Sequence, residues 1–341
     1  MLTERQRLIL NAIVNDYILS AEPVGSRSIS KRPEMKYSPA TIRNEMSDLE
    51  EMGYLEQPHT SAGRIPSHKG YRYFVDHLIR PGRLNQDVLR KVKNFFAKKI
   101  YETEEIVQQV ANILSDLTRY TSFVLEPEIY NATLKHLQLV PLNDETAVAI
   151  IVTNTGHVEN RTVSIPKNIP MNEIERFVNF LNAKLVGVPL MHFRSTLYNE
   201  IDNELSRHVK QYQELINLLE QVINKEHEDK LYISGAANML AQPEFQDVEK
   251  AKVLFDLFEE TKTIAKVFAS QEEGLQIRIG RENVLEEMSQ CSLITVTYSI
   301  EGQSLGTIGI IGPTRMEYGK VLDLMDYLSK DLALIFSRWY K

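Results

Sequence analysis

Residues 38–66 read SPATIRNEMSDLEEMGYLEQPHTSAGRIP, and this stretch decides the fold of the N-terminal part of the chain. Ser38 followed by Pro39 is typical of a helix start, because serine caps free backbone N–H groups and proline fits the first helical position. Gly53 comes just past the end of the helix, where glycine is common. Between them lies a narrow apolar stripe made of Ile42, Met46 and Leu49. The stretch therefore predicts a helix over residues 38–52.

The segment after that helix predicts a wing. Residues 54–57 can form a short strand that ends at Pro58, and a polar loop over residues 59–64 precedes Ile65 and Pro66. Ser67 can then cap another helix. The apolar side chains of that helix recur at helical spacing and are Tyr71, Phe74, Val75, Leu78 and Ile79.

Two more helices are predicted upstream. Thr3 and Gln6 match a capping box, and the helix that follows runs to about Ser20. Its apolar face consists of Leu10, Ile13, Val14, Tyr17 and Ile18. Residues 21–25 break this helix, and residues 26–31 are long enough for a short second one. Three helices, a strand, a loop and a fourth helix, in this order, are typical of a winged helix-turn-helix domain.

The polar face of the helix over residues 38–52 is divided by charge. Its last turns carry Asp48, Glu50 and Glu51, which cannot lie against phosphates, so only its N-terminal half can enter a DNA groove. We expect Arg43 and Asn44 to contact base edges there, with Ser38 and Thr41 near phosphate. The alternative is that Arg43 and Asn44 are ordinary solvated helix residues.

Basic and polar residues of the wing and the following helix complete the expected DNA-binding set. These residues are His59, Thr60, Arg64, Lys69 and Arg72. Arg64 is expected to grip the adjacent backbone or minor groove, although a position beside Gly63 also suits simple turn chemistry. For His59, an ordinary loop residue is an equally open alternative to a phosphate contact.

The distribution of charge supports a local DNA-binding face. The chain has 341 residues and a net charge of −7, which argues against a protein coated in basic surface. Residues 1–83 nevertheless hold 12 Lys and Arg against 10 Asp and Glu, whereas the remainder holds 27 against 36. A basic patch on an acidic protein suits selective DNA binding.

Composition also excludes several classes of protein. Cys291 is the only cysteine, so we expect neither an internal disulfide nor a multi-cysteine zinc site, and we interpret Cys291 as core packing. The N-terminus does not resemble a signal peptide and no apolar run approaches about 18 residues. We therefore expect a cytoplasmic protein without membrane association, metal or cofactor.

Catalytic motifs are missing from the sequence. The glycines at the C-terminal end miss P-loop spacing, because six residues separate Gly312 from Gly319 and Val321 follows Lys320. No nucleophile turn is recognisable either. The chain is thus predicted not to be an enzyme.

The rest of the chain predicts mixed α and β structure. Helical material is expected after residue 83 up to Arg119, over residues 172–185, along a longer helix of residues 197–219, and from Val321 to the C-terminus. Strand candidates are residues 121–125, 134–140, 147–153, 158–165, 231–233, 275–279, 293–300 and 305–311. The second, third and fourth of these are expected to form an antiparallel meander.

Residues 53–66, the segment KGYRYFVD at 69–76 and the segment SPATIRNEM at 38–46 closely resemble the HrcA family of heat-inducible transcription repressors. The likeness extends in length and element order over the whole chain. His68 departs from the acidic residue that we expect in relatives. The resemblance implies a homodimer that binds an inverted-repeat operator of double-stranded DNA upstream of chaperone operons. It also implies that the chaperonin GroE supports the active repressor and that heat stress removes this support.

The same resemblance implies an α+β multidomain fold in three parts. Residues 1–83 would be the winged helix-turn-helix domain, residues 84–128 and 229–341 a discontinuous GAF-like domain, and residues 129–228 an inserted dimerisation domain. The candidate dimer contacts are Phe177, Leu181, Leu197 and Ile201, since a repressor of a palindrome needs two-fold symmetry. For any one of them, filling the monomer core is the alternative.

A rival hypothesis belongs to a different class. A GAF-like pocket could bind a small effector, with DNA binding as the output, although we do not expect such an effector. A ligand site should be concave with convergent polar groups, whereas a structural domain should be filled by its own apolar side chains.

Overall fold

The computed structural model describes residues 2–339, apart from 59–62, 80–81, 83, 97–102, 126–132, 155–157, 189–216, 219–230, 262, 265–266, 268–273 and 301–302. The chain forms two compact units. The first comprises residues 1–100, 105–126 and 230–334, and the second comprises residues 101–104, 127–229 and 335–341.

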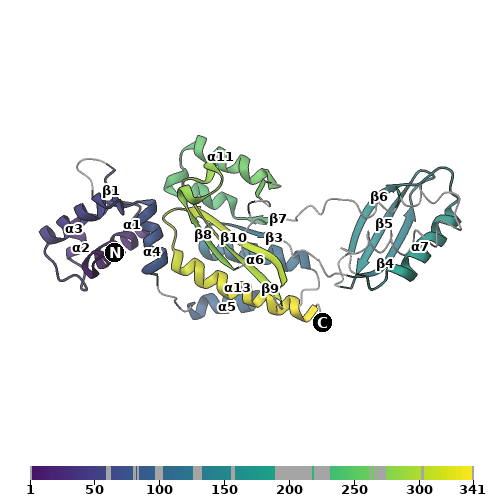
Figure 1. Cartoon of the computed structure of the whole chain (residues 1–341), viewed down its shortest axis with the longest axis horizontal. Coiled ribbons are helices and arrows are strands. Elements are labelled where there is room, and N and C mark those ends of the chain that lie inside the picture. The colour runs from purple at the N-terminus through teal and green to yellow at the C-terminus, as the bar shows by residue number, and fades with distance from the viewer. Residues whose placement is uncertain are drawn as a thin grey trace. The chain divides into compact units, whose positions relative to one another are not determined.

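The first unit begins with the predicted winged helix-turn-helix (Figure 1). Its elements are α1 (Glu4–Ser20), α2 (Ser26–Ser30), α3 (Pro39–Glu51), β1 (Leu55–Glu56), β2 (Ile65–Pro66) and α4 (His68–His77). The predicted caps form as expected. Thr3 and Gln6 make a reciprocal capping box, and the hydroxyls of Ser38 and Ser67 accept from the backbone N–H groups of Thr41 and Gly70.

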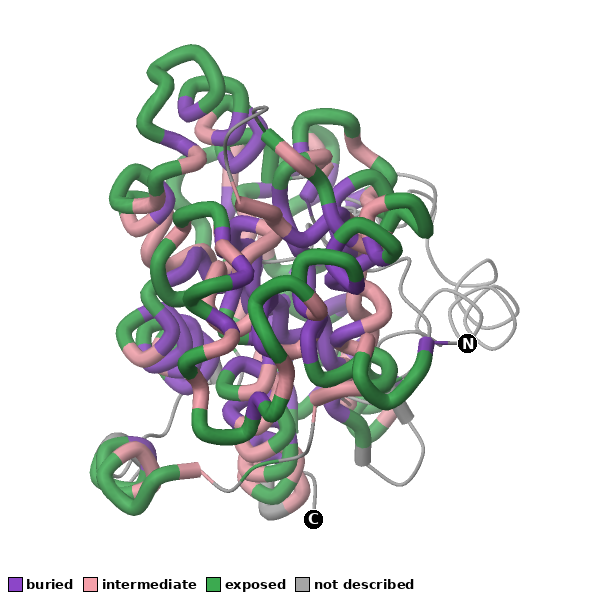
Figure 2. The backbone as a smooth tube through the Cα atoms, turned by 90° about the vertical axis from the view of Figure 1, so that its left-hand side faces the viewer, coloured by how far each residue is buried: buried purple, intermediate pink, exposed green. Residues whose placement is uncertain are grey.

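Much of the core of this domain comes from the predicted apolar stripes. Leu10, Ile13, Ile42, Leu49 and Tyr71 of those stripes are fully buried, and so are Ile9 and Ile29, which the prediction did not include. Figure 2 shows exposed residues on the outer turns of the helices and buried ones on the inner side. Burial of one stripe per helix therefore fixes which face of each helix meets water.

A five-stranded antiparallel sheet forms the rest of the first unit, in the order β7-β3-β10-β9-β8. The strands are β3 (Thr121–Leu125), β7 (Leu231–Ser234), β8 (Leu275–Ile279), β9 (Cys291–Ile300) and β10 (Gln303–Pro313). The helices are α5 (Gln86–Phe96), α6 (Thr103–Thr118), α11 (Val248–Glu259) and α13 (Tyr318–Trp339), with short 3₁₀ turns η3 (Ala236–Ala241), η4 (Pro243–Phe245), η5 (Gly280–Glu282) and η6 (Glu286–Met288). Every strand predicted for this region is present, whereas α11 was not among the predicted elements.

Helical elements pack on both faces of this sheet. On one face Ser122 donates to the carbonyl of Ala111 in α6 at 2.6 Å, and the hydroxyls of Ser292 and Tyr318 lie 2.6 Å apart at the start of α13. The other face holds an apolar cluster of Phe123, Met239, Phe245, Leu254, Leu257, Phe258, Ile264, Met288, Cys291, Leu293 and Ile311. Cys291 is fully buried there, as predicted, and burial raises the pKa of its thiol to about 12.

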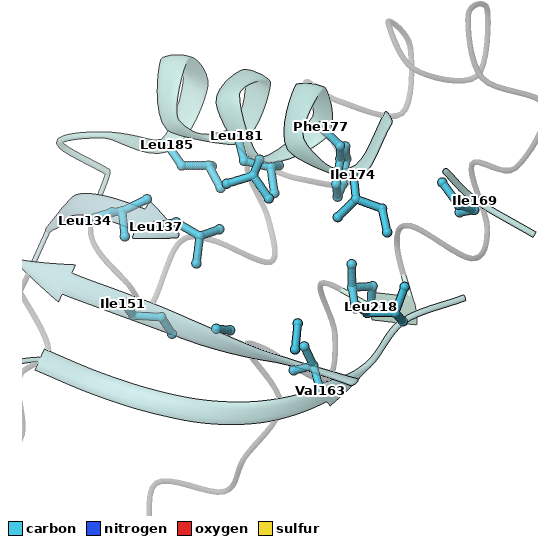
Figure 3. Packing of buried hydrophobic residues seen from close by; sticks show 14 residues of the cluster. Leu134, Leu137, Ile151, Val163, Ile169, Ile174, Phe177, Leu181, Leu185 and Leu218 are labelled. Atoms are coloured by element: carbon cyan, nitrogen blue, oxygen red, sulfur yellow. The ribbon is translucent and has the colours of Figure 1, made fainter. Parts of the chain in front are cut away.

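The second unit contains the predicted antiparallel meander, β4 (Leu134–Pro141), β5 (Thr146–Thr153) and β6 (Val158–Ser164), with α7 (Met171–Leu185) packed against it. Figure 3 shows α7 directing its apolar side chains at the sheet. The buried cluster consists of Leu134, Leu137, Ala147, Ala149, Ile151, Val163, Ile165, Ile169, Ile174, Phe177, Val178, Leu181, Leu185 and Leu218. Of the predicted longer helix, only residues 217–218 are described. Among the described residues of the whole chain, no helix combines the length and apolar character that a membrane crossing requires.

An asparagine of α7 forms hydrogen bonds with backbone groups at the free edge of this sheet. The strand β4 lies at the edge, so alternate backbone groups point away from β5. Asn182 satisfies two of them, because its Oδ1 accepts from the N–H of Leu137 at 2.7 Å and its Nδ2 donates to the carbonyl of Leu137 at 2.7 Å.

Replacing Asn182 should therefore destabilise this domain selectively. Asn182→Ala leaves a partly buried N–H and a partly buried carbonyl unpaired. We expect the free energy of unfolding to fall by about 1 kcal/mol or more. Urea denaturation of the full chain, followed by circular dichroism, measures the effect. Asn179→Ala on the exposed face of the same helix is the matched control. Equal unfolding midpoints for the two variants would contradict the assigned role.

Candidate nucleic-acid interface

The helix α3 is held with one face in the core and the other in water. Ile42, Glu45, Met46 and Leu49 are buried, whereas Ala40, Arg43, Asn44 and Ser47 are exposed. The Ser38 hydroxyl accepts from the Thr41 N–H at 3.1 Å and lies 2.9 Å from the Thr41 hydroxyl. Arg43 and Asn44 thus project into solvent from the first turns, next to a capped helix N-terminus.

A buried carboxylate on α3 has a partner that sequence reasoning missed. Glu45 is only 6% exposed and forms an ion pair with Arg5 of α1, whose guanidinium also lies over the ring of Tyr37. Because Arg5 neutralises Glu45, this acidic residue does not repel phosphate from the exposed face of α3.

The base of the wing is anchored to the turn before α2. Val24 and Arg64 exchange two backbone hydrogen bonds of 2.9 Å, and β1 pairs with β2. The Arg64 guanidinium is bound to Glu50, with its Nε 2.7 Å from Oε2. Arg64 therefore already has a partner inside the domain, and a DNA contact would require exchanging it. His59 and Thr60 lie outside the described residues.

Lys69 caps the C-terminal end of α3. Its ammonium donates to the carbonyl of Met52 at 2.7 Å and lies 4.5 Å from the centre of the Tyr54 ring. A cation at this position stabilises the negative end of the helix dipole. Lys69 is exposed, so a phosphate contact remains a prediction, but it now competes with this cap.

Arg72 is the expected DNA-binding residue whose surroundings differ most from the expectation. It bonds to Asp76 on its own helix and to Glu282 and the carbonyl of Ile277 in the sheet region of the first unit. These bonds engage Nε and both terminal nitrogens. The geometry therefore favours an internal role for Arg72 over a DNA contact.

Two of the four expected dimer contacts belong to the described residues. Phe177 and Leu181 are 5% and 1% exposed, and both lie in the core of the second unit. For these two residues the structure favours the alternative that they fill the monomer core. Leu197 and Ile201 lie outside the described residues. Within the described part of the chain, no group of three or more His, Cys, Asp and Glu side chains is placed to hold a metal ion.

Known proteins match this chain along nearly its whole length. The family described as "Winged helix-turn-helix transcription repressor, HrcA DNA-binding" matches residues 1–77, and "HrcA protein C terminal domain" matches residues 104–322. The heat-inducible transcription repressor HrcA of Brevibacillus brevis is 52% identical over 341 residues, covering 100% of both chains. Its counterpart in Halalkalibacterium halodurans is 49% identical and covers 100% of this chain and 99% of the relative.

A solved structure shares the fold. The crystal structure of a hypothetical protein matches with a TM-score of 0.64 at 23% identity, covering 99% of this chain and 98% of the other. The winged helix, the exposed first turns of α3 and these matches define a DNA-binding transcription repressor, not an enzyme. The chain belongs to the HrcA family of heat-inducible transcription repressors.

The anchored base of the wing generates a stability prediction. A Cβ added at Gly63 would lie 2.4 Å from the carbonyl oxygen of Val24, which is backbone that cannot easily move. Gly63→Ala should therefore lower the free energy of unfolding of the winged helix by about 1–3 kcal/mol, as overpacking does elsewhere.

Gly25→Ala is the control, because a Cβ there meets nothing within 4 Å. Thermal unfolding of the two variants and of the parent gives the comparison. A Gly63→Ala variant as stable as Gly25→Ala would show that the wing base is not constrained in this way.

Proposed function

We propose that this protein represses chaperone operons by binding an inverted-repeat operator as a homodimer, and that heat stress relieves the repression. The observation that carries the proposal is the pair of exposed side chains Arg43 and Asn44 on the capped first turns of α3. The matches to named heat-inducible repressors over the full chain support it.

Each protomer places the N-terminal half of α3 in a major groove. Arg43 and Asn44 meet base edges, where an arginine pairs bidentately with guanine and an asparagine with adenine. Ser38 and Thr41 lie near phosphate, and His59 and Thr60 are assigned to contacts with the adjacent DNA backbone. Arg64 and Lys69 join the contact only if DNA replaces their partners inside the domain.

We assign the functions of the chain to three domains. Residues 1–83 bind DNA, residues 84–128 and 229–341 form a GAF-like domain, and residues 129–228 form an inserted dimerisation domain. Support comes from the five-stranded sheet, since β3 and β7 are neighbours although the meander lies between them in sequence. The second unit is largely that intervening segment.

Regulation depends on partners that the family resemblance implies. The chaperonin GroE keeps the repressor active in the cytoplasm, and unfolded proteins divert the chaperonin during heat stress. A small-molecule effector is not required. The apolar cluster that fills the space beside α11 supports a structural role for the GAF-like domain rather than a ligand pocket.

Binding to an inverted repeat from a chaperone promoter tests this function. Fluorescence anisotropy compares that duplex with one carrying a single base change in each half-site and with a scrambled duplex, with and without chaperonin. We expect salt-sensitive, selective binding of two protomers per duplex, with a larger active fraction when chaperonin is present.

Arg43→Ala should reduce the discrimination between the operator and its base-changed version by about 1–3 kcal/mol, because a bidentate base contact is lost. Arg90→Ala removes an exposed arginine from α5 and is the matched control. Equal affinity of the parent protein for operator and scrambled duplexes would contradict the proposed function. If Arg43→Ala still distinguished the operator from its base-changed version as the parent does, only the role of Arg43 would be wrong.

A further inference from the structure

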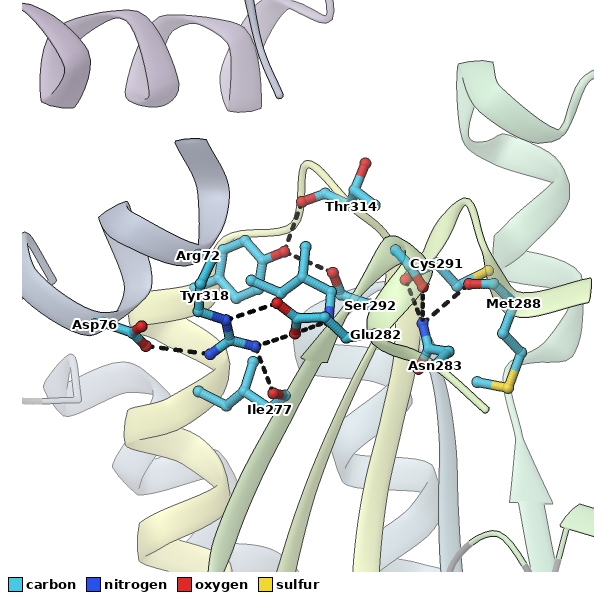
Figure 4. Close-up of polar contacts among 12 residues, drawn as sticks. Arg72, Asp76, Ile277, Glu282, Asn283, Met288, Cys291, Ser292, Thr314 and Tyr318 are labelled. Carbon is cyan, nitrogen blue, oxygen red and sulfur yellow. Dashed lines mark hydrogen bonds and ion pairs between the residues drawn. The ribbon is translucent and has the colours of Figure 1, made fainter. Parts of the chain in front are cut away.

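A cluster of charged residues joins the winged helix to the sheet of the first unit. We call the side chains of Arg72, Asp76 and Glu282, together with the Ile277 carbonyl, the clamp (Figure 4). Arg72 donates from Nε to Glu282 Oε1 at 3.0 Å, from one terminal nitrogen to Asp76 at 3.1 Å, and from the other to Ile277 at 2.6 Å and to Glu282 Oε2. The guanidinium thus spans two parts of the fold that are about 200 residues apart in sequence.

A backbone N–H group also holds the carboxylate of Glu282 in place. Its Oε2 also accepts from the backbone N–H of Ile279 at 2.9 Å, where β8 ends. Burial would raise the pKa of Glu282, but the hydrogen bonds from Arg72 and Ile279 outweigh this and lower the pKa. Hydrogen bonding to Glu282 raises the pKa of Arg72 in turn. The pair is therefore fully charged at neutral pH.

The turn that contains Gly280, next to Glu282, lies close to the His68 side chain of α4. Gly280 has a φ of +58°, and a Cβ there would lie 2.4–2.7 Å from three ring atoms of His68. A larger residue at position 280 would therefore need a strained backbone and a shift of the His68 ring, which lies in the first turn of α4. Tyr71 of the same helix is buried beside Tyr318, with ring centres 6.2 Å apart.

A second arginine binds the last turn of α1. Arg315 donates to the carbonyl of Ile18, in the last turn of α1, at 3.1 Å. Its other bonds go to Glu244 at 2.6 and 3.3 Å and to Gln242 at 3.1 Å. The winged helix is thus held at two helices, by Arg72 on α4 and by Arg315 on α1.

We propose that the clamp sets the half-site spacing that this repressor accepts, with Arg72 and Glu282 as positioning residues rather than DNA contacts. The inference rests on the proposed binding of an inverted repeat by a dimer. Such a dimer engages both half-sites only when its two recognition helices match their separation. A winged helix held at a fixed angle makes the second contact efficient at one spacing, whereas a released one tolerates several spacings and gains less at each.

The test is a series of operator duplexes whose central spacer is shortened or lengthened by one to five base pairs. Affinities of the full-length parent protein, Glu282→Gln and Glu286→Gln are compared on each duplex. Glu286→Gln removes an exposed carboxylate one 3₁₀ turn further along the chain and is the matched control. A duplex with one half-site reports whether the winged helix itself still binds.

We expect one sharp optimum for the parent and the control. For Glu282→Gln, the ratio of affinities between the best spacing and the altered spacings should fall by roughly threefold or more, because a partly buried ion pair is lost. Single half-site binding should stay the same, since no clamp residue belongs to α3.

Three results would overturn the inference. A spacing profile of Glu282→Gln that superimposes on a sharp parent profile would show that the clamp does not set the spacing. A broad profile for the parent would show that other joints in the chain dominate. Loss of single half-site binding would show that Glu282 acts on the fold of the winged helix. Failure of the parent to bind any inverted repeat would instead contradict the proposed function itself.

Discussion

The hydrogen bond from the Thr41 N–H to the Ser38 hydroxyl, 3.1 Å long, fixes the residue at which α3 begins. A helix turns by about 100° per residue, so its starting point and its buried stripe together determine which side chains meet water. With Ile42 and Leu49 in the core, Arg43 and Asn44 must point outward. The proposed recognition of DNA depends on this phase, because a slip of one residue would turn either Arg43 or Asn44 toward the core.

The far end of α3 is held by side chains as well. Arg64 of the wing base neutralises Glu50, and the ammonium of Lys69 caps the carbonyl of Met52. Basic residues near a DNA-binding helix therefore have two uses, and here several of them shape the recognition helix before any DNA arrives. The exposed guanidinium of Arg43 has no such partner among the described residues, which agrees with a role in recognition.

Most helices and strands could be predicted from short-range features of the sequence. Ser38 and Ser67 cap their helices as serine before a helix does. Short runs typical of strands, several of them bounded by turn residues, located the strands of the two larger sheets. The helix α11 was overlooked, although Asp247 caps it and Leu254, Leu257 and Phe258 form a buried stripe. Strand order was beyond sequence reasoning, because the pairing of β3 with β7 joins residues about 110 positions apart.

The candidate site was harder to predict than the fold. A sequence displays charges but not their partners, and Arg72 finds Glu282 210 residues further along the chain. An apolar helical stripe likewise looks the same whether it faces its own sheet or a second protomer. The packing of Phe177 and Leu181 against the meander could therefore be seen only once α7 was placed on it.

Disulfide trapping on operator DNA tests most directly whether the first turns of α3 enter the groove. Cys291 is the only cysteine, and its burial leaves an introduced cysteine as the reactive thiol. Ala40 and Glu51 are exposed near opposite ends of the helix. With a thiol tethered to a base inside a half-site, Ala40→Cys should cross-link and Glu51→Cys should not. Cross-linking of Glu51→Cys but not of Ala40→Cys would contradict the account.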